Sequence, residues 1–224
     1  LFRPSLVGVF INPFFIIGAG LYKNIKYFGN RITGKTLDVG CGIKPYDDLQ
    51  SSEYIGLNIE QSGHNHVNSK VDVYYDGKVF PFKKEEFDCV VTFEVLEHVF
   101  NPVEFLQEIN QVLKPNEKLL LTTPFIWDEH EQSYDYDRYS SFGIKHLLTQ
   151  NGFEIIELRK RVPNFGVIFQ LINAYIYKLF SINIVIKVFA LLFMIPIALL
   201  GILSSFILPD DEDLYHNNIV LAKK

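Results

Sequence analysis

Short runs of apolar residues recur along the middle of the chain and are separated by segments of mixed polarity. Two of them, CVVTF at 89–93 and LLLTT at 119–123, are apolar almost throughout and do not alternate with charged residues. Continuous apolar runs of this length are typical of strands buried on both faces of a largely parallel sheet. The pattern predicts seven strands, at residues 36–40, 54–58, 70–74, 87–93, 118–123, 153–159 and 218–222.

Helical spacing of apolar residues lies between several of these strands. Asn101 and Pro102 are suited to the start of one helix, and Pro115 is expected to end it. A second helix is predicted over 141–151, with Gly152 as the left-handed residue at its end. Strands alternating with helices predict an α/β fold, a doubly wound and mostly parallel seven-stranded sheet. Ligands of such sheets bind beyond the carboxyl ends of the strands, where the strand order reverses.

Apolar residues dominate both ends of the chain. Segment 188–208 contains no charged residue, which is unusual for the surface of a soluble enzyme. Because the last strand is expected to return to the sheet, we expect this segment to belong to a helical hairpin that does not cross a bilayer. It would lie in one leaflet of a membrane, or its helices would bury against each other and the N-terminal segment or in a homodimer interface. The predicted organisation is an apolar helical segment over 1–34, the core over 35–162, the hydrophobic hairpin over 163–213 and the final core strand over 214–224.

Charge and cysteine content limit the partners and the compartment. The formal net charge is -5 and the basic residues are scattered, so nucleic acid is not an expected partner. Cys41 and Cys89 stand in apolar strand contexts and form no CxxC pair, which predicts buried thiols without zinc or a disulfide. The N-terminal segment lacks the pattern of a signal peptide. We therefore expect a cytoplasmic protein, associated with the inner face of the membrane.

A glycine-rich turn follows the first predicted strand, in the sequence TLDVGCGIKPYDD at 36–48. Gly40 and Gly42 allow the backbone to turn sharply and to approach a ligand closely. A dinucleotide fingerprint would continue with another small residue, but the chain continues with Ile43-Lys44-Pro45. This departure counts against an oxidoreductase that uses a nicotinamide cofactor.

The motif LDVGCG at 37–42 resembles motif I of the class I methyltransferases, which use S-adenosylmethionine (SAM). The resemblance continues through YIGLNIE at 54–60, DGKVFPF at 76–82 and the segment 87–124. The resemblance covers about residues 35–160. This segment is similar to type 11 methyltransferases found with bacterial cell-envelope and polysaccharide synthesis. It implies a Rossmann-like fold with SAM as the cofactor.

The resemblance also assigns roles in cofactor binding. Asp38 would anchor the amino group of SAM, Gly40 would leave room for its methionyl and ribose part, and Asp76 would meet the adenine amine. Asn58 stands where the family has an acid for the ribose hydroxyls, so the charge-assisted bond is missing unless Glu60 supplies it. Asn58 and Asp76 are also common turn residues, which is the alternative interpretation of both. The predicted cofactor-binding residues are Asp38, Gly40, Cys41, Gly42, Asn58, Ile59, Asp76, Gly77, Phe93 and Glu94.

Three polar residues follow the fourth strand, in the sequence EVLEHV. Glu94, Glu97 and His98 have i, i+3, i+4 spacing, so on a helix they would share one face. Some quinone O-methyltransferases that this segment resembles hold a divalent cation with this pattern. Alternatively, Glu94 lines the cofactor pocket while Glu97 and His98 brace the next helix. The sequence leaves the metal undecided and makes His98 a candidate catalytic residue.

The segment after the fifth strand is rich in aromatic and acidic residues, and such loops commonly carry function on a rigid scaffold. His130 is the candidate general base, because an imidazole exchanges protons near neutral pH. Tyr136, Arg138 and Tyr139 are expected to shape the acceptor pocket. In the alternative interpretation, the aromatic residues pack as a lid and His130 is an ordinary surface histidine.

The function predicted from these features is SAM-dependent methyl transfer. The expected acceptor is an oxygen of a small or lipid-linked molecule, such as a glycan precursor or a quinone, because no Asn-Pro-Pro-Tyr-type motif for amine methylation follows the fourth strand. A SAM-binding scaffold at the membrane, without turnover, is the alternative from a different class.

Overall fold

A computed structural model of the chain describes residues 8, 12, 14–47, 49, 51–60, 69–163, 165–180, 184–209 and 212–224. The chain forms two compact units. The sheet unit comprises Lys26–Phe125, Glu129–Arg159 and Asn218–Lys224, and the helical unit comprises Leu1–Ile25, Ile126–Asp128 and Lys160–Asn217.

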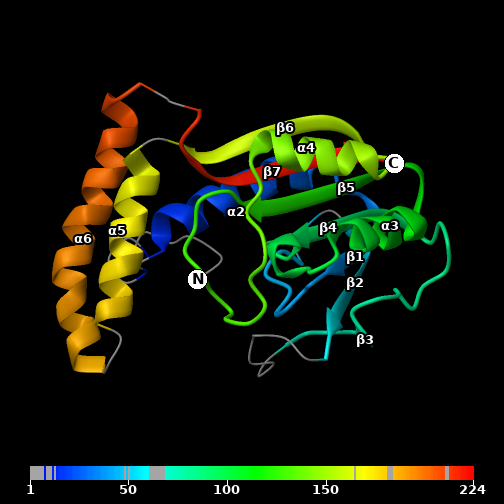
Figure 1. Ribbon diagram of the computed structural model, residues 1–224, viewed down its shortest axis with the longest axis horizontal. Helices are drawn as coiled ribbons and strands as arrows, with labels where there is room; N and C mark the ends of the chain where they lie inside the picture. Colours follow the sequence, from blue (N-terminus) through cyan, green and yellow to red (C-terminus); the bar gives the residue numbers. More distant parts are fainter. Residues whose placement is uncertain are drawn as a thin grey trace. The chain divides into compact units, whose positions relative to one another are not determined.

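A seven-stranded sheet forms the centre of the sheet unit, in the order β3-β2-β1-β4-β5-β7-β6. The pairs β1–β2, β1–β4, β2–β3 and β4–β5 are parallel, whereas β7 runs opposite to β5 (Figure 1). The strand order reverses between β1 and β4, which places the expected ligand site there. All seven predicted strands and the predicted fold class are confirmed. The strands are β1 (Gly34–Val39), β2 (Ser51–Ile59), β3 (Val73–Tyr75), β4 (Phe87–Phe93), β5 (Leu113–Pro124), β6 (Glu154–Pro163) and β7 (Tyr215–Lys223).

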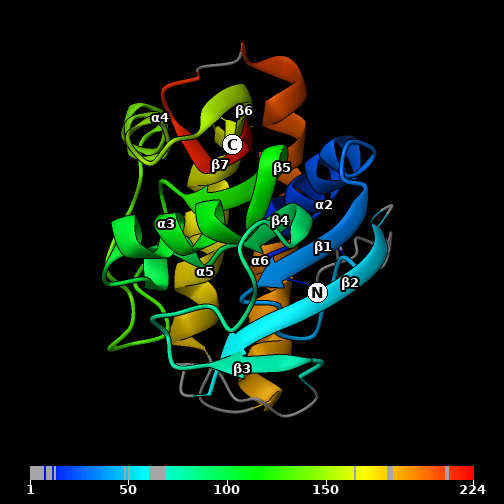
Figure 2. The same cartoon turned by 90° about the vertical axis from the view of Figure 1, so that its right-hand side faces the viewer.

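Two helices cover one face of this sheet, α3 (Pro102–Val112) and α4 (Ser141–Gln150) (Figure 2). The apolar residues on their inner faces are buried against residues of the central strands, which are buried on both faces as the continuous apolar runs predicted. The hydroxyl of Ser140 accepts a hydrogen bond from the amide of Gly143 and caps the start of α4. Gly152 has φ 82° after the end of α4, as predicted.

The end of α3 differs from the prediction. The helix ends at Val112, and Pro115 lies inside β5 instead of ending the helix. Leu113 is already extended (φ -72°, ψ 136°) and pairs with Phe87 of β4. The pairing shifts register between Phe87 and Cys89, and such an irregularity accommodates a proline within a strand.

The helical unit contains α5 (Phe165–Leu179), α6 (Ile184–Ile207) and the first part of α2 (Phe15–Gly29). The buried amide of Asn173 on α5 donates to the carbonyl of Met194 on α6 at 3.2 Å. A side chain at Gly201 would place its Cβ 2.8 Å from Cβ of Phe169, so the absence of a side chain lets α5 and α6 approach closely. Within the described residues, no helix combines the length and the hydropathy needed to cross a membrane.

Two glycines at opposite ends of α4 give opposite predictions for stability. We expect Gly152→Ala to lower the free energy of unfolding by about 1–2 kcal/mol, because an L-residue is strained at φ 82°. An added Cβ there would also lie 3.2 Å from the amide nitrogen of Asn110. Gly143→Ala should raise the free energy of unfolding by up to about 1 kcal/mol, because alanine favours a helix and only Ser140 Oγ lies near, at 3.5 Å. Urea unfolding of both variants measures the difference, and equal effects would contradict the assigned backbone conformations.

Candidate functional site

The glycine turn at the end of β1 has the conformation that the sequence predicts. Gly40 and Gly42 have φ values of 78° and 50°, in the region that favours glycine. A Cβ on Gly40 would lie 2.3 Å from Cγ2 of Val95, so the backbone here is in close contact with the segment after β4. The amide of Gly40 donates to the carbonyl of Leu57 at 2.9 Å, which fixes the turn to the end of β2.

Asp38 is a buried carboxyl group immediately before this turn. Its side chain is 2 % exposed, and its Oδ2 accepts a hydrogen bond from the hydroxyl of Tyr54 at 2.8 Å. Burial raises the pKa of Asp38 to about 7, although the Tyr54 hydrogen bond and the Lys44 charge both act in the opposite direction. The predicted anchor for the cofactor's amino group is therefore held at the end of the strand, with its charge poorly compensated.

Lys44 contributes to this edge in a way that the sequence reasoning missed. It has φ 51°, an uncommon conformation for a residue with a side chain, and the turn directs its ammonium group back toward β2. That group donates to the carbonyl of Tyr54 at 3.3 Å and forms an ion pair with Asp72. The amide of Gly56 also donates to Asp72, at 2.6 Å. The one signal in the sequence was a lysine where a glycine-rich turn would continue with a small residue.

The predicted residues at the ends of β2 and β3 lie side by side. Asn58 pairs with Tyr74 in the ladder, and Cβ on Gly77 would lie 3.7 Å from Cγ2 of Ile59. The amide oxygen of Asn58 accepts from the backbone amide of Ile59 at 2.9 Å. Asp76 accepts from the amides of Lys78 and Val79, at 2.9 and 3.1 Å. Both side chains thus accept hydrogen bonds from the backbone, as expected if they are turn residues. Both also lie at the edge of the sheet where the cofactor is predicted to bind.

The amides of Lys78 and Val79 hold the pKa of Asp76 below its usual range, so it is a carboxylate at neutral pH. Phe93 ends β4 and meets the ring of Tyr46 edge to face, with centroids 4.9 Å apart. Cys41 is buried and forms no disulfide, and burial raises the pKa of its thiol to about 12. The cysteine therefore packs the turn and does not serve as a nucleophile.

The segment after β4 does not form the expected helix face. Only Leu96–His98 is helical, as the 3-10 helix η1, and Glu94 lies before it with φ 55°. The prediction that Glu94, Glu97 and His98 share one face of an α-helix is therefore wrong. The amide of Glu94 donates to the hydroxyl of Thr122 on β5, at 3.1 Å, and this contact turns the chain before the helix begins.

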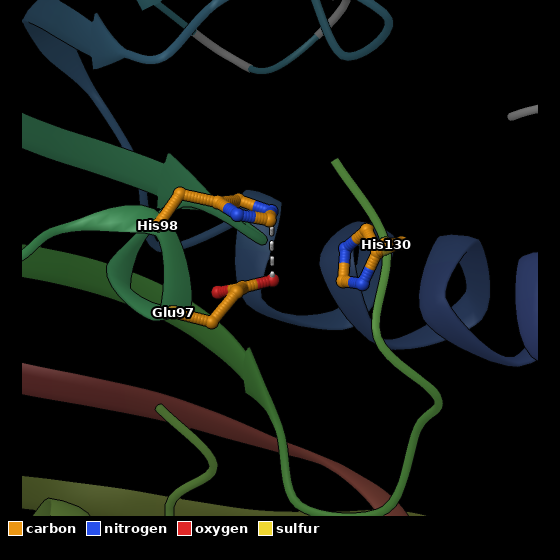
Figure 3. A group of neighbouring side chains, drawn as sticks. All are labelled: Glu97, His98 and His130. Atoms are coloured by element: carbon orange, nitrogen blue, oxygen red, sulfur yellow. Dashed lines mark ion pairs between the residues drawn. The ribbon is translucent and has the colours of Figure 1, made fainter. Parts of the chain in front are cut away.

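The structure instead brings His98 together with His130. Their rings meet edge to face with centroids 4.8 Å apart, His98 from η1 and His130 from the loop after β5 (Figure 3). Glu97 is fully buried beside them, with Oε1 3.9 Å from Nε2 of His98. Burial and the nearby charge of Glu94 raise the pKa of Glu97 well above its ordinary value. The two candidate catalytic histidines, far apart in the sequence, thus share one site.

The tautomer of His98 follows from its partner. Nδ1 lies 2.7 Å from the carbonyl oxygen of Tyr134, and a carbonyl can only accept, so Nδ1 carries the proton. Nε2 then presents a lone pair in the neutral ring. It is buried without a hydrogen-bond partner, 3.4 Å from Oε1 of Glu131.

The predicted acceptor residues lie in the same loop but differ in their contacts. Arg138 forms a two-pronged ion pair with Asp135, at 2.5 and 2.7 Å. Burial alone would raise the pKa of Asp135, but Arg138 and the amide of His130 bring it down to about 2. Tyr136 is half exposed, whereas Tyr139 donates its hydroxyl to Asp137 at 3.1 Å. The sequence reasoning missed Asp135, because nothing distinguishes it from the other acids of the loop until the fold places it beside Arg138.

Comparison with known proteins agrees with this geometry. The family model described as a methyltransferase domain matches residues 19–158, more than half of the chain. A protein of Mycolicibacterium smegmatis named "Probable S-adenosylmethionine-dependent methyltransferase" is 30% identical over 137 residues, which cover 58% of this chain and 51% of that protein. The mitochondrial ubiquinone biosynthesis O-methyltransferase of Dictyostelium discoideum is 25% identical over 113 residues, covering 39% of this chain and 34% of the relative.

The fold also matches solved structures. The phosphoethanolamine N-methyltransferase 2 of Haemonchus contortus, in complex with SAM, aligns with a TM-score of 0.58 at 19% identity, covering 97% of this chain and 55% of that chain. The chain spans about a third and about half of the length, respectively, of the D. discoideum and M. smegmatis relatives it matches. The family match, the strand order and the glycine turn together place the chain in the methyltransferase-domain family, as a class I domain whose cofactor is S-adenosylmethionine.

Proposed function

We propose that the protein transfers the methyl group of SAM to an oxygen of a small or lipid-linked acceptor at the cytoplasmic face of a membrane. The observation that carries this proposal is the pairing of His98 with His130 at the carboxyl ends of β4 and β5. This edge adjoins the glycine turn through the contact of Val95 with Gly40. Imidazoles that can accept a proton are thus held next to the predicted cofactor edge.

The chemistry requires alignment and one proton transfer. The acceptor hydroxyl oxygen attacks the methyl carbon of the sulfonium, the carbon–sulfur bond breaks, and S-adenosylhomocysteine leaves with the bonding electron pair. In this proposal the hydroxyl proton passes to His130, and Asp135, whose Oδ2 lies 3.4 Å from Nδ1 of His130, stabilises the imidazolium that results. Tyr136, Arg138 and Tyr139 line the acceptor side.

Oxygen is favoured as the acceptor atom for two reasons. A hydroxyl must lose its proton during transfer, so a base is required, and the site offers two imidazoles with His98 in a defined tautomer. The D. discoideum relative is by its name an O-methyltransferase of ubiquinone biosynthesis. A lipid-linked acceptor methylated on oxygen would agree both with the need for a base and with the name of this relative.

The surface of α6 supports the membrane location. Apolar residues spaced three and four apart on this helix are each about half exposed or more, so one whole face of the helix is apolar. Contiguous apolar surface of this kind marks a site of contact with lipid or protein. The residues are Phe189, Leu192, Phe193, Leu199, Leu200, Leu203 and Ile207.

A SAM-binding scaffold without turnover is the alternative function. It is favoured by Asn58, which replaces the expected ribose acid and whose amide oxygen already accepts from the backbone of Ile59. Such a protein would bind SAM weakly and transfer no methyl group, so the two functions differ in a directly measurable outcome.

Methyl transfer is tested with SAM labelled in its methyl group and a lipid extract of the native host. We expect label in an extracted product, and we expect His130→Ala to slow its formation about 100- to 10,000-fold because a positioned base is lost. His146→Ala, on the exposed side of α4, is the matched control and should react at the normal rate. SAM binding by the wild-type protein without any labelled product would favour the scaffold.

The affinity for SAM should depend on pH through Asp38. Because the folded protein holds this carboxyl's pKa at about 7, it is neutral at pH 5.5 and ionised at pH 8. The cofactor's ammonium group prefers the carboxylate, so we expect calorimetry to show SAM affinity rising with pH across this window. Asp38→Asn should weaken binding about 10- to 100-fold at pH 8 and remove this rise.

Asp76→Asn is the control for the pH experiment. The pKa of Asp76 is already below its usual range, so its loss should leave the rise with pH unchanged whatever it does to affinity. A wild-type affinity that is flat between pH 5.5 and 8 would contradict the role of Asp38.

Membrane association is tested by flotation with vesicles made from a bacterial lipid extract. We expect the wild-type protein to float with the vesicles, and Leu192→Glu/Leu203→Glu to lower the partition coefficient about 100-fold, because two large apolar contacts are lost. Phe142→Glu is the matched control, since this side chain is 80% exposed on α4 of the sheet unit and should not matter. Flotation of the double variant at the wild-type level, or no flotation of the wild type, would refute the proposal.

A further inference from the structure

We propose that Glu97, His98 and His130 form a binding site for a divalent transition-metal ion, with Glu131 as an additional ligand. One ligand atom from each of the first three side chains can be chosen so that all lie within 4.8 Å of one another. Oε1 of Glu131 lies 3.4 Å from Nε2 of His98. Figure 3 shows Glu97 and His98 leaving η1 next to the ring of His130.

The spacing suits a site that closes on a cation. Ligands of a tetrahedral zinc ion at about 2.0–2.1 Å lie roughly 3.4 Å from one another. The separations in the cluster are at or somewhat above this value. A cation bound between these groups would therefore draw the ligand atoms closer together.

The outer nitrogen of His98 is held in the manner typical of metal ligands, and the ring of His130 is held within its own loop. Nδ1 of His98 donates to the carbonyl of Tyr134 at 2.7 Å, which leaves the Nε2 lone pair facing the carboxylates. Nδ1 of His130 lies 3.4 Å from Oδ2 of Asp135 and 3.5 Å from a guanidinium nitrogen of Arg138, so this ring is held by two partners of its own loop. Second partners of this kind fix the ring orientation and raise the basicity of the ligating nitrogen.

Glu97 supplies an independent observation that points to a cation. Its side chain is 0% exposed, and neither carboxylate oxygen has a hydrogen-bond partner. A buried carboxyl group without partners is costly, and buried charges are normally paired or coordinate a metal. Arg138 does not hydrogen-bond to it, because the guanidinium forms its short contacts with Asp135. A cation between Glu97 and the histidines would offset this cost.

The proposed ligand set differs from the pattern Glu94, Glu97 and His98 that the sequence suggested. Glu94 adopts φ 55° before η1 and is not part of the group whose ligand atoms converge. His130, from the loop after β5, takes the third position. Two imidazoles with carboxylates favour Zn²⁺ or Co²⁺ over Mg²⁺, which prefers oxygen ligands and retains water.

The proposed metal site lies at the same edge of the sheet as the site of the proposed methyl transfer. Metal binding does not depend on which acceptor is methylated. A bound cation lowers the pKa of a coordinated hydroxyl, so in the metal-bound protein the histidines are ligands and not bases. Loss of activity in His130→Ala would fit either role, and only a measurement of metal binding distinguishes them.

The test is calorimetric titration of the full chain with Zn²⁺ and, separately, with Mg²⁺, after treatment with a chelator and dialysis. We expect one Zn²⁺ per chain and much weaker binding of Mg²⁺. Co²⁺ in place of Zn²⁺ should give visible d–d absorption from a site with nitrogen ligands. His130→Ala and Glu97→Gln should each weaken Zn²⁺ binding more than about 10-fold, since even outer partners contribute that much.

Two controls separate this site from other metal-binding residues. Glu94→Gln should retain the wild-type Zn²⁺ affinity, and so should His64→Ala/His66→Ala, which removes a closely spaced pair outside the described residues. Urea unfolding, measured on every variant, shows that each one is folded. No Zn²⁺ binding by the wild-type protein, or wild-type affinity in His130→Ala, would overturn the proposal. In either case methyl transfer could still proceed with the histidines as bases.

Discussion

The close contact between Gly40 and Val95 is the constraint on which the functional edge depends. Gly40 ends β1 with φ 78°, and a Cβ there would lie 2.3 Å from Cγ2 of Val95. Val95 follows β4 and directly precedes the helix that carries Glu97 and His98. Because β1 and β4 are neighbouring parallel strands, both segments leave the sheet at the same edge, and this contact fixes how near they come. One absent side chain thus couples the cofactor turn to the histidine cluster.

Two buried carboxyl groups at this edge explain why it should attract cations. Asp38 is 2 % exposed and has one hydroxyl donor, whereas Glu97 is fully buried and has no hydrogen-bond partner. A carboxyl group removed from water is stable only when protonated or paired. Each carboxyl group can therefore still bind a positive charge, which in our proposals is the ammonium group of SAM for Asp38 and a metal ion for Glu97. Burying two such groups costs the fold some stability.

The fold could be predicted from the sequence because the strands are continuously apolar, whereas the details of the site depend on tertiary contacts. Burial on both faces leaves a local signature in each strand, and all seven were found. Local rules predict a helix end at Pro115, because they cannot show that Leu113 pairs with Phe87. The spacing of Glu94 fits a helix, but the hydrogen bond from its amide to Thr122 turns the chain first. The approach of His130 to His98 has no local signature at all, since it depends on which strands are neighbours.

The hydrophobic hairpin is best understood from where it enters the chain. It connects β6 to β7, which are neighbours at the edge of the sheet, so a short turn would suffice to join them. The closure entropy of a loop grows only slowly with its length, so a long insertion here costs the sheet little. An exposed apolar face such as that of α6 is, however, a liability for solubility. In our proposal, the chain carries two apolar helices here instead of a short connection because their surface contacts the phase that holds a lipid-linked acceptor.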